Sequence, residues 1–452
     1  MKGPATVSHE HHQFVVLVTL CVGMFMAILD VNVINIATIS IRSEFHAPVS
    51  AITWAVDAYI LSLCGLMLSG GTLADRYGSR RIWLSGLVLF ACASLGCGMS
   101  VAMWQLILFR ILQGAGAALF IPASFSLLSA GWPDRHARQR AIGMFGGLVS
   151  VAAATGPVLG GVLVDDFGWR SIFFISLPAG LYGICSGYRP LPTVLPSRLR
   201  ALDFTGQVLA MASLGCLSWV LIQLPEQKWG QSALPLMALA SLLCAGGFVM
   251  VEHKSASPIL PLVFFRSPAF NLANLSGFFI NVCYFGSLYA LSIILQQYWH
   301  YTPFQSGMAL LPLAFFLFVG NLSAGRLMRR WGIKKQMVTG LLAGSVGYAG
   351  MISLHGQITL LAFLSMALLA GGVAFAVPPM TAAVLAGRTQ DTAGTASAIH
   401  TTFRQTGSLV GIALAGLIFS CTQHPITVLM GLSALVHLLL ALMNAVMHPE
   451  VT

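Results

Sequence analysis

The sequence predicts an all-α polytopic membrane protein with fourteen transmembrane helices. Of the 452 residues, 57% are hydrophobic and only 8% are charged, whereas soluble proteins carry about 25% charged residues. Fourteen apolar runs are long enough to cross a bilayer, which takes roughly 20 residues each. The basic residues gather in alternate connections between these runs, as the positive-inside rule requires.

The predicted spans follow one another along the chain with short connections. The first six are Phe14–Thr38, Ala51–Thr72, Ile82–Val101, Met103–Ala130, Ala141–Val164 and Ile172–Tyr188. Two more, Phe204–Leu224 and Ala233–Val251, precede the stretch 252–269, which we interpret as a cytoplasmic, interfacial loop. The last six are Phe270–Gln297, Phe304–Leu327, Met337–Leu354, Ile358–Ala386, Thr395–Cys421 and Ile426–Met447. No connection is long enough for a soluble catalytic domain.

The distribution of basic residues tests this number of helices. If the N-terminus lies in the cytoplasm, 18 of the 23 Lys and Arg residues fall in the tail or the inner connections. Only Arg42, Arg170 and Lys228 fall in outer connections. One missed or invented early helix would destroy this asymmetry. We therefore expect cytoplasmic N- and C-termini, and the net charge of +10 reflects topology rather than nucleic-acid binding.

Neither the cysteines nor the histidine-rich tail predicts a metal site or a cofactor. The nine cysteines lie inside or at the ends of apolar runs and form no CxxC pair, as expected of small core residues. The motif HEHH at 9–12 belongs to a polar tail, 1–13, for which solvation is the simpler interpretation. The tail has no cleavage pattern, so we expect the first helix to remain in the mature protein.

Two halves of the chain resemble each other. "GTLADRYG" begins at Gly71 and "GRLMRRWG" at Gly325, 254 residues apart, and both follow G-x-L-x-x-R-x-G. "GPVLGG" and "GIALAG", and Pro122 and Pro378, recur near the same offset. We therefore expect two six-helix bundles, 14–190 and 270–452, with two additional helices in 191–251. Duplicated helical halves are typical of secondary transporters.

Four motifs, in order, resemble the fourteen-helix drug:proton antiporters of the major facilitator superfamily. "LDVNVIN" is similar to that family's first-helix motif, with Asn32 in place of Thr. "GGTLADRYGSRR" is similar to its loop 2–3 signature, and "RILQGAGAA" and "GPVLGG" match its fourth- and fifth-helix motifs. The resemblance covers essentially the whole chain. It implies the major facilitator fold and drug export across a bacterial inner membrane, driven by inward proton flow.

Only two acids, Asp30 and Asp57, lie within the predicted spans, at a depth similar to that of Arg110. Burial disfavours the charged form of a carboxyl and a nearby arginine favours it, so a carboxyl between these effects can exchange protons. We expect Asp30 and Asp57 to couple protons to export, with Arg110 and Gln113 modulating them. Replacement of either Asp by Asn should then abolish proton-driven export and leave folding largely intact. The alternative is a structural Asp–Arg pair.

The expected substrate cavity combines polar and aromatic side chains of both halves. Its candidate residues are Asn32, Asn35, Trp54, Tyr59, Gln113, His400 and Arg404. Flat lipophilic cations suit aromatic linings, although single aromatic residues often face lipid. His400 is either a titrating group or a packing residue, and Arg404 would contact an anionic group or a carbonyl. Some cation exporters of the family that this chain resembles carry acids in the C-terminal half, so the absence of an acid from the tenth span argues against dication selectivity.

Two further groups of residues predict elements that move during transport, a gate and a cytoplasmic latch. Gly156, Pro157, Gly160 and Gly161 make the fifth helix closely packed and bendable, as a gate requires, although ordinary tight packing needs the same residues. Gly71, Asp75, Arg76, Gly78 and Arg81 in one half, and Arg329 and Arg330 in the other, are candidates for a cytoplasmic latch, since Asp75 corresponds to Arg329. The alternative is that these basic connections only set topology.

Together, these features predict a proton-coupled antiporter that exports small amphipathic, cationic drugs or biocides by alternating access. We expect a monomer in a lipid bilayer, with the drug and protons as its partners. One alternative is an exporter dedicated to a single metabolite or antibiotic on the same fold. A membrane sensor or intramembrane enzyme is disfavoured, because HExxH, GxSxG and any soluble output domain are absent from the sequence.

Overall fold

The computed structural model describes residues 4–132, 134–188, 191–192, 203–224, 233–255, 258, 260–353, 359–386 and 390–447. Within helices, the side chains of residues 4–12, 135–136, 138–140, 142–143, 146–150, 153–154, 329 and 390–394 lie outside this description. In the described residues each predicted span corresponds to a helical segment, so the predicted fold class is confirmed. Eleven of these helices are long and apolar enough to cross a membrane.

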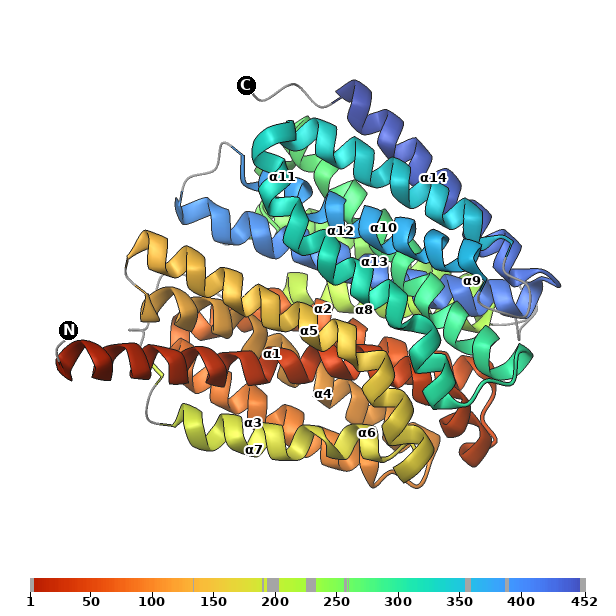
Figure 1. Cartoon of the computed structure of the whole chain (residues 1–452), viewed down its shortest axis with the longest axis horizontal. Coiled ribbons are helices and arrows are strands. Elements are labelled where there is room, and N and C mark those ends of the chain that lie inside the picture. The colour runs from red at the N-terminus through yellow and green to blue at the C-terminus, as the bar shows by residue number, and fades with distance from the viewer. Residues whose placement is uncertain are drawn as a thin grey trace.

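The helices follow the predicted order (Figure 1). The first group is α1 (Pro4–Phe45), α2 (Val49–Tyr77), α3 (Ser79–Gly98), α4 (Met103–Gly131), α5 (Arg135–Phe167), α6 (Ser171–Phe174) and α7 (Ser176–Gly187). Then come α8 (Phe204–Gln223) and α9 (Leu234–Lys254). After a 3-10 turn, Leu262–Arg266, the last group is α10 (Pro268–Ile293), α11 (Pro303–Met351), α12 (Leu360–Leu385), α13 (Gln390–Cys421) and α14 (Pro425–Met447).

Three predicted spans differ in form from the others. The sixth is divided into α6 and α7, which follow each other with one intervening residue. The tenth and eleventh are joined as α11, which turns back on itself at Gly332.

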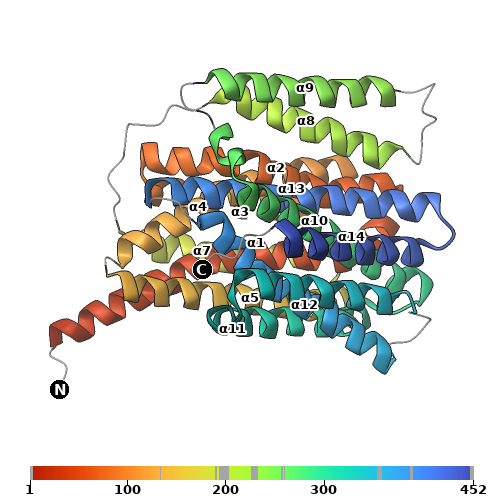
Figure 2. The ribbon, with the colours of Figure 1, turned by 90° about the horizontal axis from the view of Figure 1, so that it is seen from above.

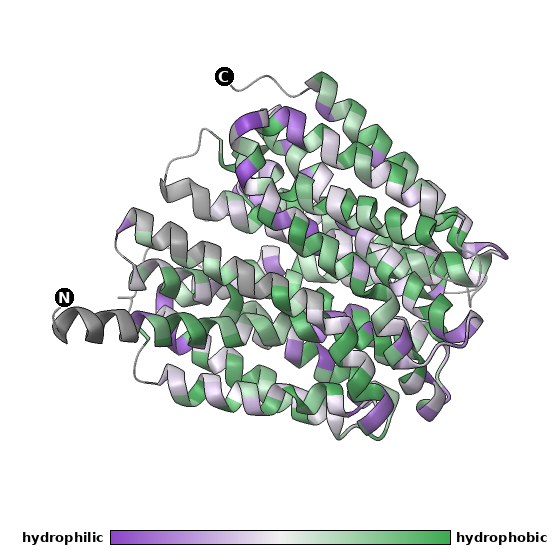
Figure 3. Ribbon diagram, in the orientation of Figure 1, coloured by the Kyte–Doolittle hydropathy of each residue, from purple (hydrophilic) through white to green (hydrophobic). Residues whose placement is uncertain are grey.

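The described helices form two bundles with a peripheral pair beside them. Helices α1–α7 pack together as the N-bundle, and α10–α14 pack together as the C-bundle. Figure 2 shows α8 and α9 side by side along one edge, where α8 contacts α2 and α13. In Figure 3 hydrophilic colour gathers mainly at helix ends and turns, as expected for helices whose sides face lipid or each other.

The bundles share two common faces. We call the face where α1 begins and α14 ends the terminal face; Gly78 and Gly332 lie on it. The opposite face, where α1 ends and α11 begins, is the distal face (Figure 1).

The repeat is visible in the backbone. Gly78, between α2 and α3, has φ 94°, and Gly332, within α11, has φ 73°. They are the final glycines of the two G-x-L-x-x-R-x-G motifs. A left-handed backbone is strongly unfavourable for residues with a Cβ, so the same glycine reverses the chain in both halves.

Candidate functional site

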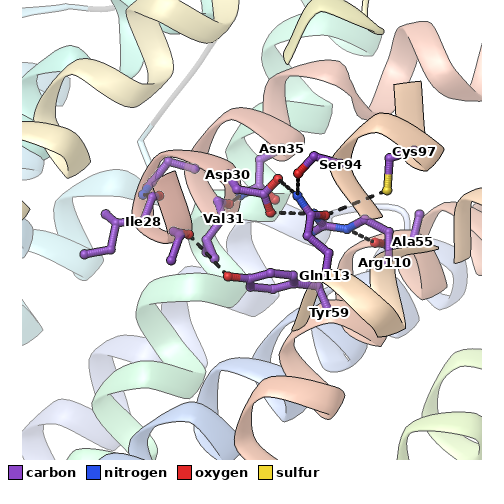
Figure 4. Close-up of polar contacts among 12 residues, drawn as sticks. Ile28, Asp30, Val31, Asn35, Ala55, Tyr59, Ser94, Cys97, Arg110 and Gln113 are labelled. Carbon is purple, nitrogen blue, oxygen red and sulfur yellow. Dashed lines mark hydrogen bonds and ion pairs between the residues drawn. The ribbon is translucent and has the colours of Figure 1, made fainter. Parts of the chain in front are cut away.

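Asp30, Arg110 and Gln113 form a polar network inside the N-bundle, in which Arg110 Nη2 is the guanidinium nitrogen without a hydrogen-bond partner in the described structure (Figure 4). Nη1 of Arg110 donates to Asp30 Oδ2 at 2.5 Å and to Gln113 Oε1 at 2.7 Å. Nε2 of Gln113 donates to Asp30 Oδ1 at 2.8 Å and to Ser94 Oγ at 2.8 Å. The structure thus brings together three of the residues named from the sequence, and their role in proton coupling stays a prediction.

Helix α2 completes the surroundings of Arg110. The Nε of Arg110 donates to the carbonyl oxygen of Ala55 at 2.9 Å, and the guanidinium carbon lies 4.5 Å from the ring centre of Tyr59. Arg110 and Tyr59 are fully buried, and Asp30 is 5% exposed. Burial of an ion pair is costly unless additional hydrogen bonds satisfy the charges. Here α1, α2, α3 and α4 all supply such contacts, which explains how this pair is tolerated at membrane depth.

Asp57 lies apart from this network, although its depth is similar. Ala55 and Tyr59 of α2 face Arg110. Asp57 is two residues from each of them, so its side chain is rotated by about 200° around the axis of α2. Asp57 therefore shares the face of Thr53, whose hydroxyl lies 3.1 Å from the Tyr289 hydroxyl of α10. Asp57 is fully buried, and neither carboxyl oxygen has a hydrogen-bond partner in the described structure. Its carboxyl thus lies unpaired where the two bundles meet.

The other cavity candidates of the N-bundle occupy different environments. Gln113 and Tyr59 are fully buried within the bundle. Asn32 and Asn35 donate to carbonyl oxygens one turn earlier on α1, at 2.7 and 3.0 Å, and Asn35 Oδ1 is buried without a partner. Asn32 and Trp54 are partly exposed. Their predicted role in lining a substrate cavity stays a prediction.

His400 and Arg404 lie together on α13 against α10. A Cβ added to Gly277 would meet His400 Cε1 at 2.9 Å and Arg404 Cγ at 3.0 Å. The His400 Nδ1 lies 3.1 Å from Asn274 Oδ1, while His400 Nε2 and Arg404 Nε are buried without partners. These two residues form a second polar site, separate from Asp30 and Arg110.

The glycines of α5 face two neighbours. A Cβ added to Gly156 would meet Asn32 at 2.9 Å, and one added to Gly160 would meet Val33 at 2.8 Å, so these two glycines pack on α1. A Cβ on Gly161 would meet the Pro303 carbonyl oxygen and Phe304 Cα, both at 2.7 Å. The predicted gate helix therefore has one face within the N-bundle and another against the C-bundle.

A second close approach completes the contact between α5 and α11. A Cβ on Gly307 would lie only 2.2 Å from the Pro157 carbonyl oxygen, and the Phe304 amide donates to Asp165 Oδ2 at 2.9 Å. Both contacts lie towards the distal face. Sequence reasoning missed Gly307, because a lone glycine in an apolar helix carries no signal of its partner.

Other contacts between the bundles lie at the distal face or at mid-depth. Gln296 Nε2 donates to the Ile36 carbonyl oxygen at 3.0 Å, and Cys64 lies close to Thr406 near the middle of α2 and α13. A pocket of about 480 Å³ opens beside the distal contacts, with Glu44, Trp169 and Tyr301 among its lining residues. In the described residues the bundles are thus joined distally, and Figure 1 shows them diverging towards the terminal face.

The predicted latch residues lie at the terminal face. Asp75, Arg76, Arg81 and Arg330 are exposed, and Gly71 is partly exposed. The Arg329 side chain lies outside the described residues, so the pairing of Asp75 with Arg329 stays a prediction.

Comparison with known proteins gives the chain its family. The family model described as "Major Facilitator Superfamily" matches residues 20–412. The chain is 37% identical to the "Methylenomycin A resistance protein" of Bacillus subtilis, over 89% of this chain and 87% of the relative. It is 30% identical to the "Multidrug resistance protein Stp" of Mycobacterium tuberculosis, over 90% and 76%.

Solved structures show the same fold at low sequence identity. The inward open xylose transporter XylE from E. coli has a TM-score of 0.68 and 14% identity and covers 97% of both chains. A structure of the peptide transporter POT with sulfate has a TM-score of 0.69 and 15% identity, over 95% of this chain and 93% of that one. The protein is therefore a multi-pass membrane transporter, not an enzyme, and it belongs to the Major Facilitator Superfamily.

Proposed function

We propose that this protein is a proton-coupled antiporter that exports small amphipathic drugs across the cytoplasmic membrane by alternating access. The observation that carries the proposal is the position of Asp57. This carboxyl is fully buried, lacks a hydrogen-bond partner, and lies where α2 of the N-bundle meets the C-bundle. A rocking motion that separates the bundles would change its access to water, as proton coupling requires.

The orientation follows from the basic residues. The connections at the terminal face carry most of the lysines and arginines, which supports a cytoplasmic position of that face by the positive-inside rule. The contacts of Gly161 and Gly307 then close the outer side, and the bundles diverge towards the cytoplasm. This arrangement suits a state that takes up a drug from inside.

The proton cycle uses the two acids differently. An ionised carboxylate is costly to bury without a partner, so the protonated form of Asp57 is favoured while the bundles enclose it. Hydration of the interface would favour its ionised form. Asp30 is already compensated by Arg110 and Gln113. In this scheme Asp57 carries the coupled proton, and the Asp30–Arg110 pair positions α1, α2 and α4 around it.

The identity of the drug is a separate matter. The expected preference for cations stays a prediction, because Asp30 is paired and Asp57 is enclosed in this conformation. The alternative of an exporter dedicated to one antibiotic is favoured by relatives such as the "Methylenomycin A resistance protein" of Streptomyces coelicolor, to which this chain is 33% identical.

The test uses the purified full-length protein in proteoliposomes. A panel of cationic, neutral and anionic drugs is added, and proton movement and drug uptake are recorded together. Drug-dependent proton movement in the wild type, absent in Asp57→Asn, is the expected result. Drug uptake that proceeds without any proton movement would contradict the proposal.

A further inference from the structure

Arg404 is a membrane-embedded arginine for which the described residues provide no ion pair. Its Nε is buried without a hydrogen-bond partner in the described structure, while the residue as a whole is partly exposed. Arg404 lies four residues from the middle of the span Thr395–Cys421, or about 6 Å along the axis. The edge of the hydrocarbon region is about 15 Å from its centre, so the side chain cannot easily reach the lipid head groups. Uncompensated charges at this depth are rare and mark functional sites.

The C-bundle contains no acid that can neutralise Arg404. From Pro258 to Met447 the only Asp or Glu is Asp391. It is thirteen residues before Arg404, which corresponds to about 20 Å along a helix.

The two acids within the predicted spans of the N-bundle are also out of reach. Asp30 is held by Arg110. Asp57 is separated from Arg404 along the axis, because Thr53 lies beside Gly416 and Cys64 lies close to Thr406 in the antiparallel pair α2 and α13. This register places Asp57 near position 412, about 12 Å from Arg404. The contrast with Arg110 is clear: its charge is matched inside the protein, and that of Arg404 is not.

A second unsatisfied group lies beside Arg404. Asn274 donates its amide to the Phe270 carbonyl oxygen at 2.9 Å, so its Oδ1 accepts from His400 Nδ1 at 3.1 Å. The neutral imidazole then presents Nε2 as an acceptor, and this atom is buried without a partner while His400 is only 3% exposed. Gly277 leaves room for both side chains, since an added Cβ would meet each of them.

We propose that Arg404 and His400 form the binding site for an acidic oxygen group, a carboxylate, of the exported compound. Arg404 donates to the carboxylate oxygens, and His400 Nε2 accepts from a neighbouring hydroxyl or N–H of the same compound. The planar guanidinium suits a carboxylate, which can accept two parallel hydrogen bonds from it. The inference rests on the proposed export function and specifies its substrate class, in opposition to the expected preference for cations.

The experiment measures equilibrium binding to the full-length protein in zwitterionic nanodiscs without a proton gradient. Three probes share one ring system and differ in charge: 2-naphthoate, 2-naphthamide and 2-naphthylmethylammonium. We expect the wild type to bind 2-naphthoate roughly ten- to a hundredfold more tightly than 2-naphthamide, as a charge-assisted hydrogen bond provides. Arg404→Gln should remove this difference, and Arg404→Lys should retain part of it. Thr401→Ala, an exposed neighbour on α13, is the matched control and should leave it unchanged.

Three results would overturn the proposal. The wild type could bind the three probes equally, or it could bind the ammonium probe more tightly than the carboxylate. The third is an undiminished carboxylate preference in Arg404→Gln. If Arg404→Gln does not fold, the carboxylate preference of the wild type and that of Arg404→Lys still test the proposal. Nanodiscs with anionic lipid should give the same preference, and its loss there would assign the site to a lipid head group. Because no gradient is used, these results are independent of proton-driven transport, whose failure would contradict only the proposed function.

Discussion

Asp57 and Arg110 lie on opposite sides of α2. Arg110 bonds to Ala55 and packs on Tyr59, whereas Asp57, two residues from each, shares the Thr53 face that meets Tyr289 of the C-bundle. The two acids within the spans of the N-bundle, Asp30 and Asp57, are therefore not one site. Asp30 is an internally compensated charge and Asp57 an isolated one, and replacements of the two should have different consequences.

Asp57→Asn should abolish proton-driven export and preserve the fold. The amide has nearly the shape of the protonated acid and removes the titrating group, so packing between α2 and the C-bundle should remain. Uptake driven by a pH gradient into proteoliposomes, beside a melting curve of the purified protein, checks both parts. Asp166→Asn, an exposed acid at the distal end of α5, is the matched control. Full transport by Asp57→Asn would exclude Asp57 as the proton carrier.

Asp30→Asn should destabilise the protein, in contrast to the expectation from the sequence that folding stays intact. It leaves the buried guanidinium of Arg110 without a counter-charge, a loss that typically costs about 3–5 kcal/mol. The double variant Asp30→Asn with Arg110→Gln should recover much of this stability. Thermal or denaturant unfolding of the three proteins measures it. A single variant as stable as the wild type would show that the pair is not required for folding.

Gly307→Leu should prevent closure of the distal face. The added side chain would collide with the Pro157 carbonyl oxygen, which lies only 2.2 Å from an ideal Cβ. Labelling of a cysteine introduced near the distal contact, from the distal side, should increase, and transport should fall to background. The control is Gly246→Leu on α9, where an added Cβ meets nothing within 4 Å. Unchanged labelling of Gly307→Leu would argue against a gate between α5 and α11.

Gly332→Ala should destabilise the C-bundle by about 1–3 kcal/mol, because its φ of 73° with ψ of 170° is a backbone region open essentially only to glycine. Gly325→Ala, earlier in the same motif with open space around its Cβ, should change stability by much less. The unfolding temperatures of the two variants make the comparison. Equal values would show that the reversal in α11 does not depend on glycine.

The sequence by itself determined the membrane class, the succession of spans and the repeat, because each depends on local chemistry. The length of an apolar run decides whether a segment can cross a bilayer. The repeated motif ends in a glycine in both halves, Gly78 and Gly332, because a chain reversal with positive φ favours glycine. The motif containing Gly156 and Gly161 likewise indicated a closely packed helix, since small residues permit close approach.

Only the tertiary structure decided which side chains meet. Depth along a helix can be counted from the sequence, and by that measure Asp30, Asp57 and Arg110 were alike. The direction in which each side chain faces depends on how α1, α2 and α4 are rotated against one another. That rotation pairs Arg110 with Asp30 and leaves Asp57 alone between the bundles, and the packing of α13 on α10 places Arg404 beside Gly277.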